Sequence, residues 1–137
     1  VFCRPEGNYF LAGVSPPEDQ DPICTDLDVT YNLFEDIIWP TLANRVPAFE
    51  AIKLVNAWAG HYAYNTWDQN ALLGPLSAVP NLYFANGFSG HGIQQSPAVG
   101  RAIAELITNG HFMSIDFSEL AVERLLTGHV VREINVF

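Results

Sequence analysis

Cysteine is nearly absent from this sequence, and its histidines are scattered. The two cysteines, Cys3 and Cys24, are too few for a disulfide framework and lack the spacing of a metal-binding pair. The four histidines lie far apart along the chain and show no metal-ligand pattern. We therefore expect free thiols and no metal site.

Basic residues are also scarce. The 137 residues include six Lys and Arg against 15 Asp and Glu, which gives a formal net charge of −9. Because binding to phosphates requires clustered Lys and Arg, this balance argues against a nucleic-acid partner. Seven of the acids fall in residues 18–36, which hold no Lys or Arg. That stretch lacks the Asp-x-Asp-x-Asp-Gly pattern of a calcium loop and is typical of a solvated loop followed by a helix start.

Long apolar runs are missing as well. Pro, Gly, Asn or a charged residue interrupts each apolar stretch, so we expect no membrane span in this segment. Hydrophobic residues still make up 49% of the chain and include nine Phe, enough for the core of one domain.

The pattern of the first half predicts a hairpin, a loop and a helix. Residues 1–5 and 9–14 have the composition of two strands around a turn at residues 6–8. Residues 15–28, rich in proline and acids, are expected to form a loop. Residues 31–45 have helical periodicity, which Pro40 should kink or split.

The second half predicts further strands and two helices. We expect a strand at residues 51–60, a short strand at 72–74 and another at 81–85. A helix should begin at Ser96, with Pro97 in its first position, and end at Gly110. A last helix is expected at residues 117–127, stopped by Gly128. The fold class is therefore mixed α+β with a mainly antiparallel sheet and flanking helices.

The most informative stretch is residues 85–100, Ala-Asn-Gly-Phe-Ser-Gly-His-Gly-Ile-Gln-Gln-Ser-Pro-Ala-Val-Gly. Its glycines let a backbone approach a flat or phosphorylated ligand, and the helix that follows offers an N-terminus that attracts negative charge. The stretch lacks the third glycine of a dinucleotide fingerprint, where Gln95 stands, and His91 occupies the place of the second glycine of a nucleophile elbow. On the local pattern alone, a ligand-contacting loop and a ligand-free strand-to-helix turn are both open.

Residues 87–92, Gly-Phe-Ser-Gly-His-Gly, resemble the C-terminal flavin-contacting motif of the FAD-dependent D-amino-acid oxidase, sarcosine oxidase and glycine oxidase family. Other stretches fit in the family's order: residues 3–7 with 9–13, Ala-Trp-Ala-Gly at 57–60, Asp68, Leu-Gly-Pro at 73–75, and residues 110–116. These landmarks cover nearly the whole chain.

The resemblance implies a FAD-dependent oxidoreductase that transfers a hydride from an amine or amino-acid-like substrate to the flavin. It assigns cofactor contacts to the loop and the start of its helix, namely Gly87, Gly90, His91, Gly92, Ile93 and Gln94. It places Trp58, Tyr62 and Gln94 at the substrate pocket and identifies no catalytic residue. Asp68 is expected to order the adjoining loop by accepting backbone hydrogen bonds.

The family's domain plan implies three parts. Residues 1–80 would belong to the substrate domain with its antiparallel sheet. Residues 81–116 would form the strand, loop and helix that return to the FAD-binding domain, and residues 117–137 a C-terminal helix and tail.

Three positions depart from the family's pattern. His61 stands where sarcosine-oxidase-like relatives bond a cysteine to the flavin; His carries flavin in other families, but we favour noncovalent FAD over a bond to His61. Tyr62 replaces an Arg that grips the substrate carboxylate, and Gln94 replaces a Lys. A charged carboxylate clamp is therefore missing from both expected places.

The sequence opens inside a predicted strand and shows no Gly-rich βαβ unit for the FAD pyrophosphate. We therefore expect the C-terminal part of a longer protein, whose partner is the N-terminal FAD-binding half. Alone, this part should bind FAD weakly and be inactive. The resemblance includes a mitochondrial branch of the family. It therefore also implies mitochondrial localisation and an alternative role, a flavin-containing interaction protein that contacts respiratory-complex subunits in complex I assembly.

Overall fold

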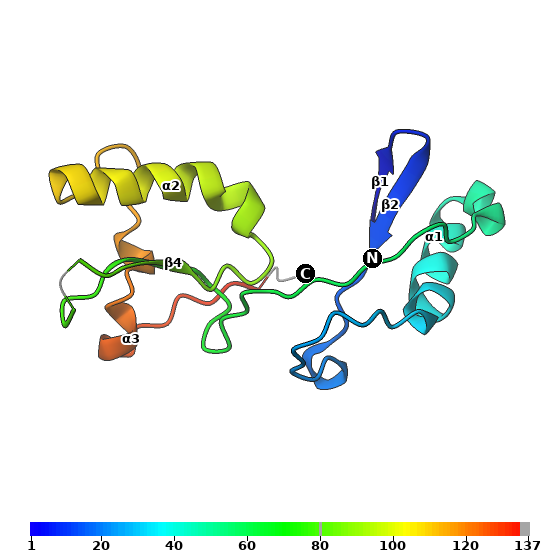
Figure 1. Cartoon of the computed structure of the whole chain (residues 1–137), viewed down its shortest axis with the longest axis horizontal. Coiled ribbons are helices and arrows are strands. Elements are labelled where there is room, and N and C mark those ends of the chain that lie inside the picture. Colours follow the sequence, from blue (N-terminus) through cyan, green and yellow to red (C-terminus); the bar gives the residue numbers. More distant parts are fainter. Residues whose placement is uncertain (80, 135–137) are drawn as a thin grey trace. The chain divides into compact units, whose positions relative to one another are not determined.

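A computed structural model describes residues 1–79 and 81–134 (Figure 1). By its internal contacts the chain forms two compact units, Val1–His61 and Tyr62–Phe137. The boundary between these units lies inside the part expected to belong to the substrate domain. The three-part functional division itself stays a prediction.

The first unit begins with the predicted hairpin. Strand β1 (Phe2–Glu6) pairs antiparallel with β2 (Tyr9–Gly13), and Phe2 lies opposite Gly13. Gly7 makes the tight turn with a φ of +59°, a conformation that residues with a Cβ rarely adopt. The ring of Phe2 covers Gly13, where an added Cβ would lie 2.6 Å from the Phe2 Cζ atom.

The predicted helix of residues 31–45 is present, and its winding changes from π-helical to α-helical just before Pro40. A wide π-helical turn (Phe34–Ile38) is followed by α1 (Trp39–Arg45), which carries Pro40 in its first turn. Proline has no N–H to donate, so it is tolerated in the first turn of α1, and the helical backbone continues across it from residue 32 to residue 45. The indole N–H of Trp39 donates to the carbonyl of Phe49, at 3.2 Å, in the 3-10 turn Pro47–Ala51. This bond ties that turn to α1.

The predicted strand at residues 51–60 is wrong. Ala51 ends the 3-10 turn, and residues 52–60 run on without a strand partner in the part of the chain that the structure describes. Alternating apolar residues favour an extended backbone, but a strand also needs a neighbour to complete its hydrogen bonds. Asn56 instead accepts a local hydrogen bond from the amide of Ala57.

The second unit is built on the two short strands predicted for it. Strand β3 (Leu72–Pro75) pairs antiparallel with β4 (Tyr83–Asn86), which starts two residues and ends one residue later than the predicted 81–85. Helix α2 (Gly92–Asn109) contacts both strands. Its Val99 packs with Ala71 and Leu73 in the core. The fold thus combines helices with small antiparallel sheets, as the sequence indicated.

Helix α2 begins earlier than predicted. Its first residue is Gly92, so Ser96 does not cap it and Pro97 lies inside it. In a regular helix the amide at position 97 would donate to the carbonyl of Ile93, which proline cannot do. The Ser96 hydroxyl donates to that carbonyl at 2.9 Å, which compensates for the missing amide. The predicted end is confirmed, since Gly110 caps the helix with a φ of +76°.

The predicted helix at residues 117–127 is interrupted. A 3-10 turn (Ser118–Leu120) and the single turn α3 (Arg124–Thr127) are separated by Ala121, which bridges Leu73, and by a turn at residues 122–123. The amide of Val122 donates to the Leu73 carbonyl at 2.8 Å, and its side chain is buried. Pairing with the sheet edge and burial of Val122 therefore replace a continuous helix. Gly128 ends α3 as predicted.

Candidate functional site

The candidate site is the loop between β4 and α2. The backbone turns sharply there, because Gly87, Ser89 and Gly90 adopt φ values of +72°, +47° and +94°. The amide of His91 donates to the Phe88 carbonyl at 2.9 Å, which closes the turn immediately before α2. Glycine tolerates these left-handed conformations, which cost other residues energy.

Ser89 is the exception, since it is a fully buried residue with a Cβ in a left-handed conformation. Its amide donates to the Ala63 carbonyl at 3.1 Å, and its hydroxyl oxygen accepts from the Asn65 amide at 2.9 Å. These two bonds hold a conformation that would otherwise be unfavourable. Backbone strain of this kind is commonly found at functional sites.

The N-terminus of α2 is open. His91 occupies the N-cap position without a side-chain cap hydrogen bond, and the first turn holds no acidic residue. The earliest helical hydrogen bond runs from the Gln95 amide to the His91 carbonyl at 3.2 Å. The amides of residues 92–94 therefore have no carbonyl acceptor within the helix. The side chain of Ile93 in this turn is 85% exposed. Such a helix end favours an anionic or electron-rich ligand edge.

The structure brings the six predicted cofactor-contacting residues together in this loop and first helical turn. Gln94, also predicted at the substrate pocket, is exposed on the same turn. Tyr62 begins the same unit and is exposed, while Trp58 is 67% exposed and belongs to the other unit. The places of Trp58 and Tyr62 beside the loop stay predictions. His61 contacts the Asp26 backbone carbonyl through Nε2 at 2.7 Å.

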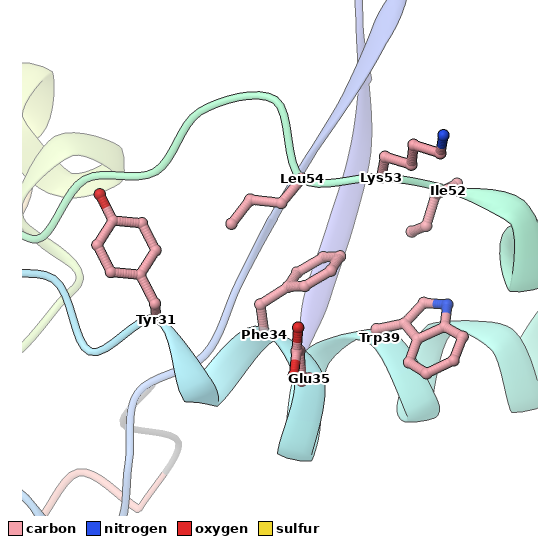
Figure 2. A pocket seen from close by; sticks show the side chains of 7 residues that line it. All are labelled: Tyr31, Phe34, Glu35, Trp39, Ile52, Lys53 and Leu54. Atoms are coloured by element: carbon pink, nitrogen blue, oxygen red, sulfur yellow. The ribbon is translucent and has the colours of Figure 1, made fainter.

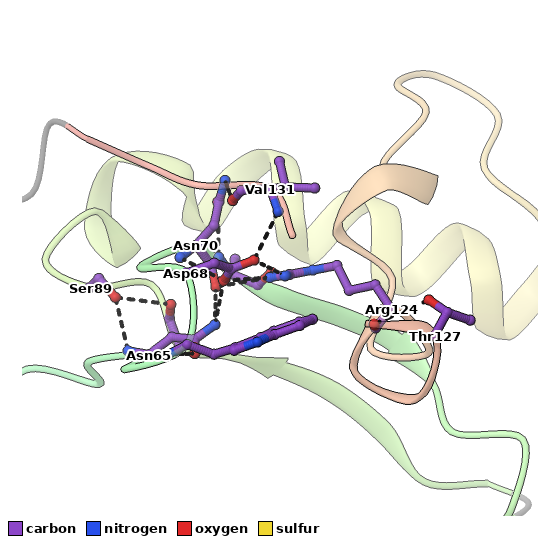
Figure 3. Close-up of polar contacts among 10 residues, drawn as sticks. Asn65, Asp68, Asn70, Ser89, Arg124, Thr127 and Val131 are labelled. Atoms are coloured by element: carbon purple, nitrogen blue, oxygen red, sulfur yellow. Dashed lines mark hydrogen bonds and ion pairs between the residues drawn. The ribbon is translucent and has the colours of Figure 1, made fainter. Parts of the chain in front are cut away.

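A buried ion pair is connected to the loop through Asn65 (Figure 3). The Arg124 guanidinium binds both carboxylate oxygens of Asp68, through Nη1 to Oδ2 and through Nη2 to Oδ1. The exposed fractions of the two side chains are 3% and 0%. Nη2 also donates to the Ala71 carbonyl at 2.9 Å, and the guanidinium lies over the Trp67 ring, 5.3 Å from its centroid. This arrangement satisfies much of the guanidinium within the protein.

The predicted role of Asp68 is confirmed and extended. Its carboxylate accepts from the backbone amides of Asn70, at 3.3 Å, and Val131, at 3.1 Å. Burial raises the pKa of Asp68, but the hydrogen bonds from Arg124 and these amides, together with the positive charge, outweigh burial and leave the pKa below its ordinary value. Asp68 is therefore a fixed anion.

The sequence did not identify Arg124, Asn65 or Ser89. Asp68 and Arg124 lie 56 positions apart, and a single Arg in a short C-terminal element gives no periodic or motif signal. For Asn65 and Ser89 the only available hint was their position beside residues already singled out.

The first unit contains an open pocket of about 600 Å³ (Figure 2). Its lining is mostly aromatic and aliphatic, with Glu35 and Lys53 as its charged members: Tyr31, Phe34, Glu35, Trp39, Ile52, Lys53 and Leu54. None of the predicted site residues lines it. Across residues 1–79 and 81–134, no cluster of three or more metal-ligating side chains occurs. No helix in that part of the chain has the length and hydropathy needed to cross a membrane.

The family model and the similar proteins all describe FAD-dependent oxidoreductases. The model of the family described as "FAD dependent oxidoreductase" matches residues 1–106. FAD-dependent oxidoreductase domain-containing protein 1 from Bos taurus is 50% identical over 127 residues, which cover 93% of this chain and 26% of the relative. The protein of the same name from Xenopus laevis is 48% identical over 130 residues, covering 95% of this chain and 26% of the relative.

A solved structure agrees with these relatives. The L-proline dehydrogenase from P. horikoshii superposes with a TM-score of 0.71 and 31% sequence identity, covering 79% of this chain and 28% of that chain. The present chain therefore spans about a quarter of the length of the proteins that it matches.

Proposed function

Since the chain belongs to the family of FAD-dependent oxidoreductases, we propose that its loop at residues 87–94 contacts the flavin of an enzyme that oxidises an amine or amino-acid-like substrate. The observation that carries this proposal is the open N-terminus of α2, entered through a left-handed glycine loop. The solved relative that shares this fold is a dehydrogenase of L-proline, a cyclic amino acid. When bound, FAD would supply the hydride acceptor for a C–H bond next to the amine nitrogen.

The residues present fit the edge of a flavin ring. Gly87 and Gly90 turn the backbone without side chains, and Gly92 is the first residue of the helix, where backbone amides lack an intrahelical acceptor. The amides of Gly92, Ile93 and Gln94 would hydrogen-bond the electron-rich N1–C2=O edge, where reduced flavin carries its negative charge. His91 would lie beside the ring and add a hydrogen bond.

The same residues restrict the substrate. Neither Tyr62 nor Gln94 carries a positive charge, so this chain provides no ionic grip on a substrate carboxylate at these places. Both side chains are exposed and can hydrogen-bond a polar substrate. We therefore expect an amine substrate. Where that amine carries a carboxylate, Tyr62 and Gln94 should add little affinity for it.

The test is a visible spectrum of protein expressed from its full coding sequence, recorded without air before and after adding N-methyl and D-amino acids, proline and simple amines. Bleaching of a bound flavin by one class supports the enzyme and identifies its substrate class. A colourless protein that takes up no added FAD contradicts the proposed role of residues 87–94.

The alternative is a flavin-containing interaction protein in assembly of mitochondrial respiratory complex I, with little or no turnover. The missing charges at Tyr62 and Gln94 favour it. A yellow protein that no substrate reduces, and that co-purifies with respiratory-complex subunits from mitochondria, would support it. Mitochondrial localisation is part of this proposal, and cell fractionation tests it.

A further inference from the structure

We propose that Arg124 is a positioning residue for the flavin-contacting loop, acting through Asp68 and Asn65. The proposal rests on the proposed function, because it concerns how the loop amides are aimed at the cofactor. It assigns a functional role to the C-terminal segment 121–133, which lies outside the matched residues 1–106.

The first step is the rigidity of the ion pair. Arg124 binds Asp68 through two nitrogens and also donates to the carbonyls of Asn70, at 3.3 Å, and Ala71, at 2.9 Å. A planar guanidinium held at four points has one orientation. A buried ion pair is a weak source of net stability, since desolvation of the charges offsets their attraction. What this pair provides is a fixed direction for the Asp68 carboxylate.

The second step is the connection from the ion pair to the loop. The Asn65 side-chain amide donates to Asp68 Oδ1 at 2.9 Å and to the Asn70 carbonyl at 2.7 Å. The backbone amide of Asn65 donates to Ser89 Oγ at 2.9 Å. A Cβ added at Gly87 would lie 3.2 Å from the Cβ of Asn65, so Asn65 also lies close to the loop backbone. One residue therefore touches both the ion pair and the loop.

The third step is the C-terminal tail. The amide of Val131 donates to Asp68 Oδ2, and the side-chain amide of Asn70 donates to the Val131 carbonyl at 3.2 Å. The amide of Glu133 donates to the Asp68 carbonyl at 3.0 Å. Figure 3 shows the tail, the ion pair and Ser89 as neighbours in one hydrogen-bonded group. The tail therefore adds two hydrogen bonds to Asp68, one to its carboxylate and one to its backbone carbonyl.

The physical consequence is that disturbing Arg124 should loosen residues 87–92, to which it is connected through Asp68 and Asn65. Because the loop amides would stabilise reduced flavin more than oxidised flavin, their loss of order should weaken the binding of the reduced form selectively. If the ion pair had only a structural role, its loss would change overall stability and leave the ratio of reduced-flavin to oxidised-flavin affinity unchanged.

The experiment compares Arg124→Lys and Asn65→Ala with the parent protein expressed from its full coding sequence. Asn65→Ala removes the link without leaving a buried charge, so it tests the proposal even where Arg124→Lys fails to fold. Glu105→Gln is the matched control. It removes an anchor near the other end of α2, where the Glu105 carboxylate accepts from the amides of Met113, at 2.7 Å, and Ser114, at 3.1 Å.

Two quantities are measured: amide hydrogen exchange at residues 87–92 without FAD, and the midpoint potential of bound FAD. We expect both test variants, and not Glu105→Gln, to speed loop exchange at least about tenfold in protein that remains folded. We also expect a roughly tenfold selective loss of reduced-flavin affinity, which lowers a two-electron potential by about 30 mV.

The proposal is overturned if the loop exchanges as in the parent, or if Glu105→Gln accelerates it equally. It is also overturned if the potential stays unchanged in variants that retain FAD. A parent protein that binds no FAD contradicts the proposed function instead, and the exchange comparison then decides separately whether Arg124 orders the loop.

Discussion

Replacing Ser89 by alanine and by glycine separates the contribution of its hydroxyl from the cost of its backbone conformation. Ser89 is fully buried, has a φ of +47°, and accepts the Asn65 amide hydrogen bond at 2.9 Å. Both variants lose that acceptor. Because the Asn65 amide is part-buried, each should lower the free energy of unfolding by about 1–3 kcal/mol.

The two variants then differ only in the backbone. Alanine retains a Cβ in the left-handed region, which costs about 1–2 kcal/mol. Glycine relieves that cost but gains freedom in the unfolded chain, worth roughly 0.4–1 kcal/mol. The difference leaves Ser89→Gly more stable than Ser89→Ala by about 0.5–1 kcal/mol.

Urea unfolding measures this difference as a shift in midpoint at constant slope. Control substitutions at Ser77, an exposed residue outside the loop, should not reproduce the glycine advantage. If Ser89→Ala proves as stable as Ser89→Gly or more stable, the loop does not hold the strain inferred from its φ value.

Three further outcomes are expected. Gly87→Ala would place a Cβ at a φ of +72° and 3.2 Å from Asn65 Cβ. It should destabilise the protein by about 1–2 kcal/mol. It should also weaken FAD binding, which a flavin fluorescence titration measures. Leu73→Ala, at a side chain 1% exposed, should cost about 2–5 kcal/mol in urea unfolding, and a cost under about 1 kcal/mol would contradict its place in the core. Hydrogen bonds from the Ser114 hydroxyl and the Met113 amide lower the pKa of Glu105 from 4.5 to about 2. The stabilisation that ionised Glu105 gives the folded state should therefore be complete above pH 4.5 and be lost as pH falls toward 2. Glu105→Gln should remove that part of the pH dependence in acid titrations of stability.

Signals that act within a few residues were sufficient to predict much of the fold. Gly7, Gly110 and Gly128 occupy the left-handed positions expected of a hairpin turn and two helix ends. The glycine loop and the strand before it were likewise predicted, because a β-rich run followed by clustered glycines has few other conformations. Such features depend on backbone sterics and not on distant partners.

The predictions failed where a distant partner decides the structure. Residues 52–60 have the alternation of a strand, but no strand partner occurs in the described part of the chain. The stretch around Val122 has helical composition, yet it joins the sheet edge at Leu73.

The start of α2 was misplaced for a local reason, because the Ser96 hydroxyl donates to the Ile93 carbonyl, which Pro97 leaves without an amide donor. Capping chemistry alone pointed to Ser96, five residues beyond the actual N-cap at His91.

The candidate site combines both kinds of information. Its glycines can be read from the sequence, and they give the loop its turn and its open helix end. Hydrogen bonds connect that loop, through Ser89 and Asn65, to an ion pair between residues 56 positions apart, which no local pattern encodes. A glycine loop that turns correctly but is poorly held would present its amides over a range of directions, and electrostatic stabilisation falls when donors must reorganise around the developing charge. Under the proposed function, the loop sequence indicates which group would be contacted, while Arg124 and its partners would set how well that contact stabilises the reduced flavin.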